Sequence, residues 1–455
     1  MNIIINGFMH PEQKQIYKYF ETYEDIEKNC IICDYKYEAI KNNTDLFIVQ
    51  DIIKGNYPYY GVLTPEQIDF INSNFFQLME MLNRFYAYLH KEFSYEEKKN
   101  IIYKHFAFWM EYIKVNNISC FISSNIPHDI YDHIILLCMK YYKKDKILFF
   151  LQSQFKDMII PMHLVEEQNI KTKIEYEKIS RLKVDLTKYA EIEWKIEKNE
   201  EIPFYMKRSS LFTRIIKDLR KIKKITIKKL LVSLSYNSKT KKLKKEYRLL
   251  SKPFEPIPNY IYFPLHFQPE MTSCMLGPTF VNQYLLIHLV DKLLPDGWKL
   301  LVKEHPKQQF CNRYFGYYKD ILMQTKNTCL VNFDTNSYDL IKHCRAVLTI
   351  SGTAGWEALF HEKPVLLCGN NFYQYAPGVF HIVSESDLKN ALSIINGDKF
   401  IYDENKLKAY LNSVEKTSIH GFVDSVYSST SSFSFIESNE NIIQYINNWL
   451  QCNEN

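Results

Sequence analysis

The segment from Ser351 to Glu357 (Ser-Gly-Thr-Ala-Gly-Trp-Glu) places two hydroxyls, two glycines and a carboxylate at the start of an expected helix. It follows the apolar run 346–350 and precedes a second apolar run at 364–368, an order that predicts strand, tight turn, helix and strand. Glycine lets the N–H groups of a helix start approach an anion closely. Glu357 lies about one turn further along, where its carboxylate can reach a ribose hydroxyl. The segment therefore predicts a nucleotide site, although helix capping and close helix–sheet packing also favour these residues.

A second polar cluster, Lys303-Glu304-His305-Pro306, follows the apolar run 299–302. A histidine at this position can donate a hydrogen bond to a phosphate oxygen, and Lys303 adds positive charge. The proline fixes its own φ and ends the strand, which holds the imidazole at the strand end. The alternative for this motif alone is a polar turn. Because ligands of doubly wound sheets lie at the carboxyl ends of the strands, the two motifs together predict one phosphate site.

Apolar runs alternate with helix-periodic segments in both halves of the chain, which predicts an α/β protein with two parallel doubly wound sheets. In the first half we expect strands at 2–6, 30–33, 46–50, 120–123 and 147–151, and helices at 65–115 and from about 130 to 142. In the second half we expect strands at 260–265, 299–302, 329–333, 346–350 and 365–368, and helices at 283–294, 338–344 and 439–450.

The C-terminal half resembles the bacterial capsule and surface-polysaccharide biosynthesis proteins that have the GT-B glycosyltransferase fold. The residues that carry the resemblance lie between about 250 and 380, and they are Tyr262–Glu270, Leu294–Gly297, Lys303–Pro306 and Ser351–Ala358 with Lys363-Pro364. The His-Pro and Ser motifs also resemble those of bacterial sialyl- and Kdo-transferases and of teichoic-acid polymerases. The resemblance implies a GT-B fold, in which two Rossmann-like domains face a cleft.

The same resemblance implies roles for individual residues. In those families a histidine and hydroxyls contact the donor phosphate, which implies that His305, Ser351 and Thr353 are phosphate ligands. Lys303 and Gly352 complete the expected nucleotide site, and Glu357 resembles the ribose-binding glutamate of other GT-B enzymes. Hydrogen-bond donors aimed at the departing phosphate remove the need for a metal, so we expect no metal and no other cofactor.

Four domains or segments are expected from these assignments. They are an N-terminal Rossmann-like acceptor domain at 1–169, a basic helical insertion at 170–258, a C-terminal Rossmann-like nucleotide-sugar domain at 259–436 and a C-terminal helix at 437–455.

Transfer of a sugar to a hydroxyl with inversion needs a base near the acceptor. His128 and Asp129 follow the expected strand 120–123, with Asp132 one turn further on to orient the imidazole. An N-cap aspartate and a surface histidine are the alternative. His10, just after the first strand, is a second candidate for the base.

His266 and Glu270 follow the first strand of the second half. We expect them either to line the cleft and bind the transferred group or to make hinge hydrogen bonds between the domains.

Positive charge is concentrated between Arg214 and Lys252, where 15 Lys and Arg residues stand against two acidic ones, although the whole chain has a net charge of only +5. Such a cationic, amphipathic stretch is able to lie on the anionic inner face of a membrane, close to a lipid-linked acceptor. The alternative is a solvated basic insertion. Nucleic acid is not an expected partner, because no nucleic-acid-reading motif accompanies the charge.

The ten cysteines are scattered, and the chain shows neither a signal peptide nor an apolar run long enough for a membrane span. We therefore expect a cytoplasmic protein, associated peripherally with the inner face of the membrane.

Taken together, these features predict a glycosyltransferase that moves a sugar from a nucleotide-activated donor to a surface or capsular polysaccharide acceptor. A CMP- or CDP-linked donor is favoured, and a UDP-linked donor is also compatible with the motifs. The alternatives are a CDP-alcohol phosphotransferase of the teichoic-acid type, a sugar-nucleotide epimerase, and a non-catalytic, membrane-associated assembly protein.

Overall fold

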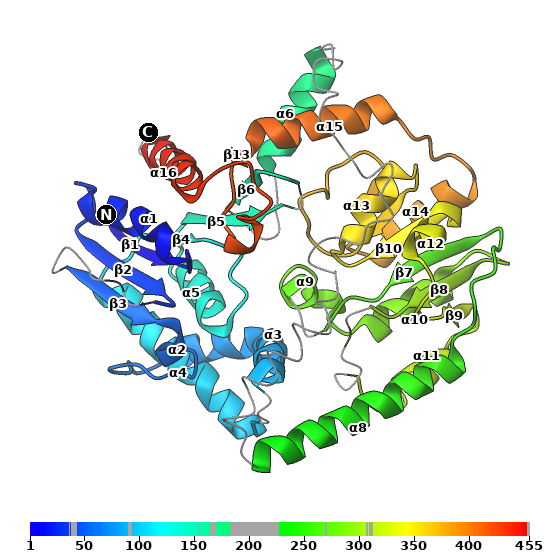
Figure 1. Ribbon diagram of the computed structural model, residues 1–455, viewed down its shortest axis with the longest axis horizontal. Helices are drawn as coiled ribbons and strands as arrows, with labels where there is room; N and C mark the ends of the chain where they lie inside the picture. Colours follow the sequence, from blue (N-terminus) through cyan, green and yellow to red (C-terminus); the bar gives the residue numbers. More distant parts are fainter. Residues whose placement is uncertain are drawn as a thin grey trace.

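The computed structural model describes residues 1–35, 37, 43–89, 93–153, 155–163, 170–182, 227–268, 271–305, 308 and 313–452. These residues form two sheets, one of seven and one of six strands. Figure 1 shows the domain built on the first sheet on the left and the domain built on the second sheet on the right. The predicted fold class, with two doubly wound domains, is confirmed.

The first sheet has the strand order β13-β6-β5-β4-β1-β2-β3. Its strands are β1 (Asn2–Asn6), β2 (Lys28–Cys33), β3 (Thr44–Ile48), β4 (Cys120–Ser123), β5 (Lys146–Gln152), β6 (Met158–Met162) and β13 (Ile419–His420). The pairs among β1 to β5 are parallel, and β6 and β13 add an antiparallel edge. Central strands such as β1 are continuous apolar runs because helices cover both faces of the sheet.

Helices of the first domain are η1 (Pro11–Gln13), α1 (Lys14–Thr22), α2 (Val49–Ile52), α3 (Pro65–Leu89), α4 (Tyr95–Val115) and α5 (Ile130–Tyr141). The long helical stretch expected at 65–115 is thus two helices. A capping box starts the second one, since Ser94 Oγ accepts from the Glu97 N–H at 3.2 Å and the Glu97 carboxylate accepts from the Ser94 N–H at 2.7 Å.

All strands of the second sheet are parallel, in the order β12-β11-β10-β7-β8-β9. They are β7 (Tyr260–Pro264), β8 (Lys299–Lys303), β9 (Thr328–Leu330), β10 (Ala346–Thr349), β11 (Val365–Leu367) and β12 (Val379–His381). The helices around it are α9 (Met271–Cys274), η5 (Pro278–Phe280), α10 (Gln283–Leu293), α11 (Tyr317–Gln324), α12 (Ser337–His343), α13 (Thr353–Phe360) and α14 (Glu385–Asn396).

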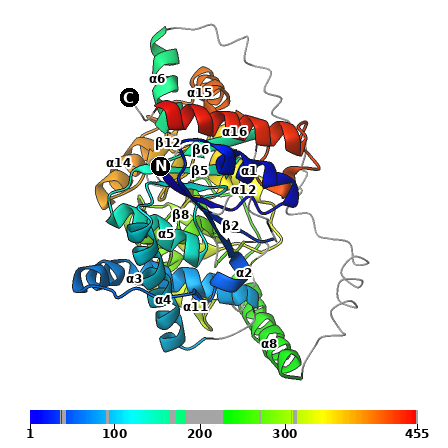
Figure 2. The same cartoon turned by 90° about the vertical axis from the view of Figure 1, so that its left-hand side faces the viewer.

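After α14 the chain returns to the first domain. Helix α15 (Glu404–Thr417) packs against α6 (Ile170–Leu182), and β13 pairs with β6. The 3-10 helix η7 (Ser425–Tyr427) follows, and α16 (Phe435–Cys452) then lies over α1, as Figure 2 shows. The expected C-terminal domain, 259–436, therefore needs a correction: β13 belongs to the first sheet. Its two residues carry too little pattern to reveal this pairing from the sequence.

The described part of the basic insertion is helical, as expected. It comprises α6 and α8 (Ile227–Leu250), and residues 183–226 lie outside the described ranges. Leu243 and Tyr247 of α8 are buried in the core of the second domain, beside α11. Among the described residues, no helix is both long enough and apolar enough to cross a bilayer.

Candidate functional site

The two polar turns lie at neighbouring strand ends of the second sheet. The order β10-β7-β8 places the end of β7 between the turn after β10 and the turn after β8. His266, which follows β7, therefore has the Ser351 turn on one side and Lys303-Glu304-His305 on the other. The register confirms that the three strands run in one direction, so their carboxyl ends share an edge.

The turn from Ser351 to Gly352 is tied down by its own neighbours. Ser351 N–H donates to His266 Nε2 at 3.1 Å, and Gly352 N–H donates to Thr349 Oγ1 at 2.9 Å. The backbone oxygens of the turn are also bonded, Ser351 O to the Asn371 amide at 2.6 Å and Gly352 O to the Tyr373 hydroxyl at 2.5 Å. The amides expected to bind phosphate at 351 and 352 are thus already used within the protein.

Helix α13 offers its first N–H groups instead. Gly352 is its N-cap and provides no side-chain cap. Within the described ranges, the N–H groups of Thr353 and Ala354 have no hydrogen-bond acceptor. Unpaired N–H groups and the positive end of the helix dipole favour an anion here. Of the amides expected to bind phosphate at 351–353, the structure therefore leaves that of Thr353 available, together with that of Ala354.

Glu357 is half-buried on the second turn of α13, and the Thr353 hydroxyl hydrogen-bonds to its carboxylate. Burial raises the pKa of Glu357 to about 7. Three neighbouring phenols, those of Tyr262, Tyr338 and Tyr373, have raised pKa values. Burial is the main cause, and the charge of the Glu357 carboxylate raises these pKa values further. Glu357 therefore sits among aromatic rings, poised to change charge near neutral pH.

Lys303 is buried at the end of β8 and serves an internal role. Its Nζ donates to the Thr335 carbonyl and, at 2.9 Å, to Ser337 Oγ at the start of α12. Ser337 Oγ also accepts from the Tyr262 hydroxyl at 3.3 Å. Burial lowers the pKa of Lys303 to about 8. Lys303 thus fixes α12 against β8. It also brings positive charge close to the residues around Glu357, because Ser337 links it to Tyr262.

A buried ion pair that the sequence analysis did not identify supports His305. The carboxylate of Glu304 accepts from two guanidinium nitrogens of Arg313, at 3.0 and 3.1 Å, and the two side chains are 0% and 3% exposed. It also accepts from the Tyr318 hydroxyl at 2.5 Å and from the His305 N–H at 2.8 Å. Arg313 donates further to the His266 carbonyl at 3.2 Å. The pair therefore connects the two histidine-bearing strand ends.

His305 lies partly exposed beside the end of β7. Its ring centroid is 5.7 Å from that of Phe267. His266 is buried. The side-chain amide of Gln283 accepts a hydrogen bond from the His266 N–H at 2.7 Å and donates one to the His266 carbonyl at 3.1 Å. Glu270, the other residue expected here, lies outside the described residues.

The candidates for the base lie in the first domain. The loops after β1 and β4 touch, since a Cβ on Gly7 would lie 1.8 Å from Ser124 Oγ, and Gly7 has φ +89°. His128 Nδ1 lies 2.6 Å from the Ile126 carbonyl. Because Nδ1–H donates to that oxygen, the neutral ring carries its lone pair on Nε2, the state that a general base needs.

At Nδ1 the His128 ring bonds to the Ile126 carbonyl and not to Asp132, which we expected to orient the ring. Burial and the charge of Asp129, at the N-cap of α5, raise the pKa of Asp132. His10 caps η1, where Nδ1 accepts from the Glu12 N–H at 3.3 Å, and its ring stacks on Phe435 at 4.4 Å. No described contact joins His10, His128 or Asp129 to the site residues of the second domain.

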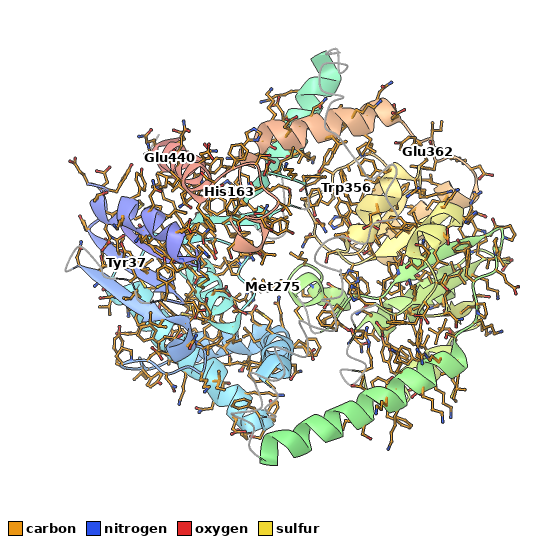
Figure 3. The ribbon with its side chains drawn as sticks, viewed as in Figure 1. Tyr37, His163, Met275, Trp356, Glu362 and Glu440 are labelled. Atoms are coloured by element: carbon orange, nitrogen blue, oxygen red, sulfur yellow. The ribbon has the colours of Figure 1, made fainter. Side chains whose placement is uncertain are left out.

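The domains contact each other beside α13 and α9. Phe155 of the first domain packs on Trp356 of α13 at 5.4 Å between ring centroids, and the Gln77 amide donates to the Cys274 carbonyl at 3.1 Å. Figure 3 shows Met275 between the two domains and Trp356 at α13. Helix α13 therefore presents its start to the strand ends and its Trp356 to the other domain.

The alternative explanation for the glycines of α13, close packing of the helix on the sheet, also agrees with the structure. A Cβ on Gly355 would lie 2.6 Å from the Tyr373 hydroxyl oxygen and 2.9 Å from Thr349 Cγ2.

Gly355→Ala is therefore expected to lower the free energy of unfolding by about 1–3 kcal/mol, measured by urea denaturation. Gly397→Ala, at the end of α14 with φ −84°, is the control and should change it by less than about 1 kcal/mol. A Gly355→Ala protein as stable as the wild type would contradict this packing.

Residues 153–381 match the family model described as capsule polysaccharide biosynthesis protein. No curated protein matches the chain. Among solved structures, the chain is similar to UDP-GlcNAc 2-epimerase from Neisseria meningitidis bound to UDP-GlcNAc, with 12% identity, 98% of this chain and 99% of that chain covered, and a TM-score of 0.25. It is also similar to the beta Kdo 2,7 transferase of Thermosulfurimonas dismutans KpsC, with 9% identity, 91% and 99% covered, and a TM-score of 0.31.

Proposed function

This chain belongs to the capsule polysaccharide biosynthesis protein family and has the GT-B glycosyltransferase fold, and from this premise we propose that it transfers a sugar from a nucleotide-activated donor to a surface or capsular polysaccharide. One observation carries the proposal. The ends of β10, β7 and β8 gather the N–H groups of Thr353 and Ala354, the imidazole of His305 and the carboxylate of Glu357 around one sheet edge. These groups suit a phosphate and a ribose.

In the proposed reaction, an acceptor hydroxyl oxygen forms a bond to the anomeric carbon as the bond from that carbon to the donor phosphate oxygen breaks. The negative charge develops on the departing phosphate. His305 and the first N–H groups of α13 stabilise that charge, because donors fixed before the reaction need no reorganisation. The ionised Glu357 accepts hydrogen bonds from the ribose hydroxyls.

The proton of the acceptor hydroxyl goes to a base on the first domain. We propose His128, because its Nδ1–H bond to the Ile126 carbonyl leaves Nε2 as the basic nitrogen. Asp129 remains the second candidate. His10 is the weaker one, because its Nδ1 accepts the Glu12 N–H and its ring stacks on Phe435.

The donor nucleotide is the first thing to measure. We propose a CMP- or CDP-linked donor, on the resemblance of the His-Pro and Ser motifs, with UDP as the alternative. Thermal unfolding is followed with CMP, CDP, UDP, GDP and TDP for the wild type, His305→Ala and Glu357→Ala. The proposal expects one nucleotide to raise the wild-type Tm and to lose this effect in both variants. If no nucleotide changes the Tm, the transferase proposal fails and an assembly role gains support.

The raised pKa of Glu357 gives a pH-dependent prediction. A carboxyl with a folded pKa near 7 and an unfolded pKa near 4.5 binds more protons when folded, so its contribution to stability falls as pH rises between these values. Glu357→Gln removes this dependence, and the variant should have a higher Tm than the wild type at pH 8 but not at pH 5. Nucleotide affinity of the wild type should rise through about pH 7 as the carboxylate ionises, and that of the variant should stay flat. Parallel Tm profiles for the two proteins would contradict the assignment.

We further propose that α8 lies on an anionic membrane surface. Figures 1 and 2 both show it along the outer edge of the molecule. Lys241, Lys245 and Arg248 recur every three or four residues and are exposed, on a helix whose Leu243 and Tyr247 are buried. In the described part of the chain, none of these three cations forms an ion pair with an acidic side chain. Each basic group near an anionic surface contributes about 1 kcal/mol.

Vesicle sedimentation tests this surface. Lys241→Glu/Lys245→Glu/Arg248→Glu should bind vesicles containing phosphatidylglycerol about 100-fold more weakly than the wild type. The matched control reverses Lys389, Lys406 and Lys408, which each pair with an acidic residue on α14, on α15 or at the N-cap of α15, and it should bind as the wild type does. The membrane proposal would be contradicted if the wild type bound neutral vesicles as tightly as anionic ones, or if the two triple variants lost vesicle binding equally.

A further inference from the structure

The buried ring of His266 lies at this sheet edge, and the proposed reaction does not yet use it. It occupies the end of the central strand, between the two phosphate-binding turns, and only 6% of the residue is exposed. Its Nε2 accepts the Ser351 N–H at 3.1 Å. A nitrogen that accepts a hydrogen bond carries no proton, so a neutral His266 must carry its proton on Nδ1.

That Nδ1 is buried and has no hydrogen-bond partner among the residues that the structure describes. A buried donor without an acceptor costs about 1–3 kcal/mol, a cost that an acceptor arriving from outside the chain would remove. The Nε2–Cε1 edge of the ring lies against the turn, since a Cβ on Gly352 would lie 3.2 Å from Nε2 and 3.4 Å from Cε1 of His266, and Nδ1 follows on the other side of Cε1. The next two residues of that turn carry the unpaired N–H groups of α13.

We propose that His266 Nδ1–H is a further ligand of the donor phosphate, held in the donating tautomer by the Ser351 amide. This inference rests on the proposed function and adds a residue to its site. In this arrangement one imidazole has two tasks: Nε2 fixes the turn that starts α13, and Nδ1–H donates to a phosphate oxygen beside His305 and the helix N–H groups.

The electrostatic surroundings of the ring agree with this role. Burial, His305 and Arg313 lower the pKa of His266 to about 3, so the ring stays neutral over the working pH range. Arg313 reaches the His266 carbonyl while it pairs with Glu304, which fixes the backbone of His266 relative to the His305 turn.

Two substitutions separate the two nitrogens. In His266→Gln, the side-chain oxygen takes the place of Nε2 and still accepts the Ser351 N–H, but no donor remains at the Nδ1 position. In His266→Asn, the shorter amide keeps a donor near Nδ1 and loses the acceptor for Ser351. The readout is the ratio of the affinity for the stabilising nucleotide to the affinity for its nucleoside, measured by ligand-observed NMR, together with the Tm. Inorganic pyrophosphate serves as a probe without a nucleoside.

The proposal expects the ratio to fall about 10- to 100-fold in His266→Gln, with nucleoside affinity and Tm close to those of the wild type. In His266→Asn the Tm should fall, because the Ser351 amide loses its acceptor, while the ratio stays within about threefold of the wild type. An unchanged ratio in His266→Gln, or equal losses in both variants, overturns the inference and leaves the proposed function standing. A wild type that binds neither nucleotide nor pyrophosphate overturns both.

Discussion

Replacing His305 with alanine is expected to lower the rate of sugar transfer by about 100- to 1,000-fold, the usual loss when one fixed donor to a developing oxyanion is removed. The side chain is partly exposed at the strand end, and its ring is tilted by 42° against that of Phe267, at 5.7 Å between centroids. Because the side chain is partly exposed, its removal should leave the Tm close to that of the wild type. The measurement is the initial rate with the nucleotide-sugar whose nucleotide stabilises the protein.

His343→Ala is the matched control for this variant. His343 is exposed in the last turn of α12, where Nδ1 lies 2.8 Å from the Asp339 carbonyl, and it has no place in the proposed site. The control should retain a rate within about threefold of the wild type. A His305→Ala enzyme that is equally active would contradict the assignment of His305 to the departing phosphate.

Replacing Glu304 with alanine is expected to lower the free energy of unfolding of the second domain by about 3–5 kcal/mol, because the Arg313 guanidinium would remain buried without its counter-charge. Both side chains are almost fully inaccessible to solvent, at 0% and 3% exposure. The Tyr318 hydroxyl and the His305 N–H lose the same acceptor. For a domain of this size the loss corresponds to a fall in Tm on the order of 10 °C, measured by calorimetry.

Glu385→Ala provides the comparison with an exposed pair. Glu385 and Lys389 approach to 2.6 Å on α14, but each side chain is half exposed. Pairs of this kind contribute at most about 1 kcal/mol, so the control should unfold nearly as the wild type does. Similar losses in the two variants would show that the Glu304–Arg313 pair does not stabilise this strand end.

Much of the fold follows from local patterns in the sequence. The apolar runs at 2–6 and 120–123 are the strands β1 and β4, residue for residue. Such runs are informative because a strand covered on both faces must be apolar throughout. The pairing of β13 with β6 had no such signal, since a two-residue strand has neither length nor periodicity. The return of the chain to the first domain therefore appears only in three dimensions.

The sequence alone also determined where the candidate site lies: the polar residues that begin at Lys303 and at Ser351 stand at strand ends, because glycine, proline and polar residues interrupt apolar runs there. Tertiary structure decided which donors remain available. His266, 85 residues before Ser351, takes the Ser351 amide, and Arg313 neutralises Glu304 inside the motif. These choices depend on the order β10-β7-β8, which sets the spatial neighbours of each polar group. Periodicity along the chain reports which face of an element is buried, and it carries no information about which distant partner satisfies a buried hydrogen bond.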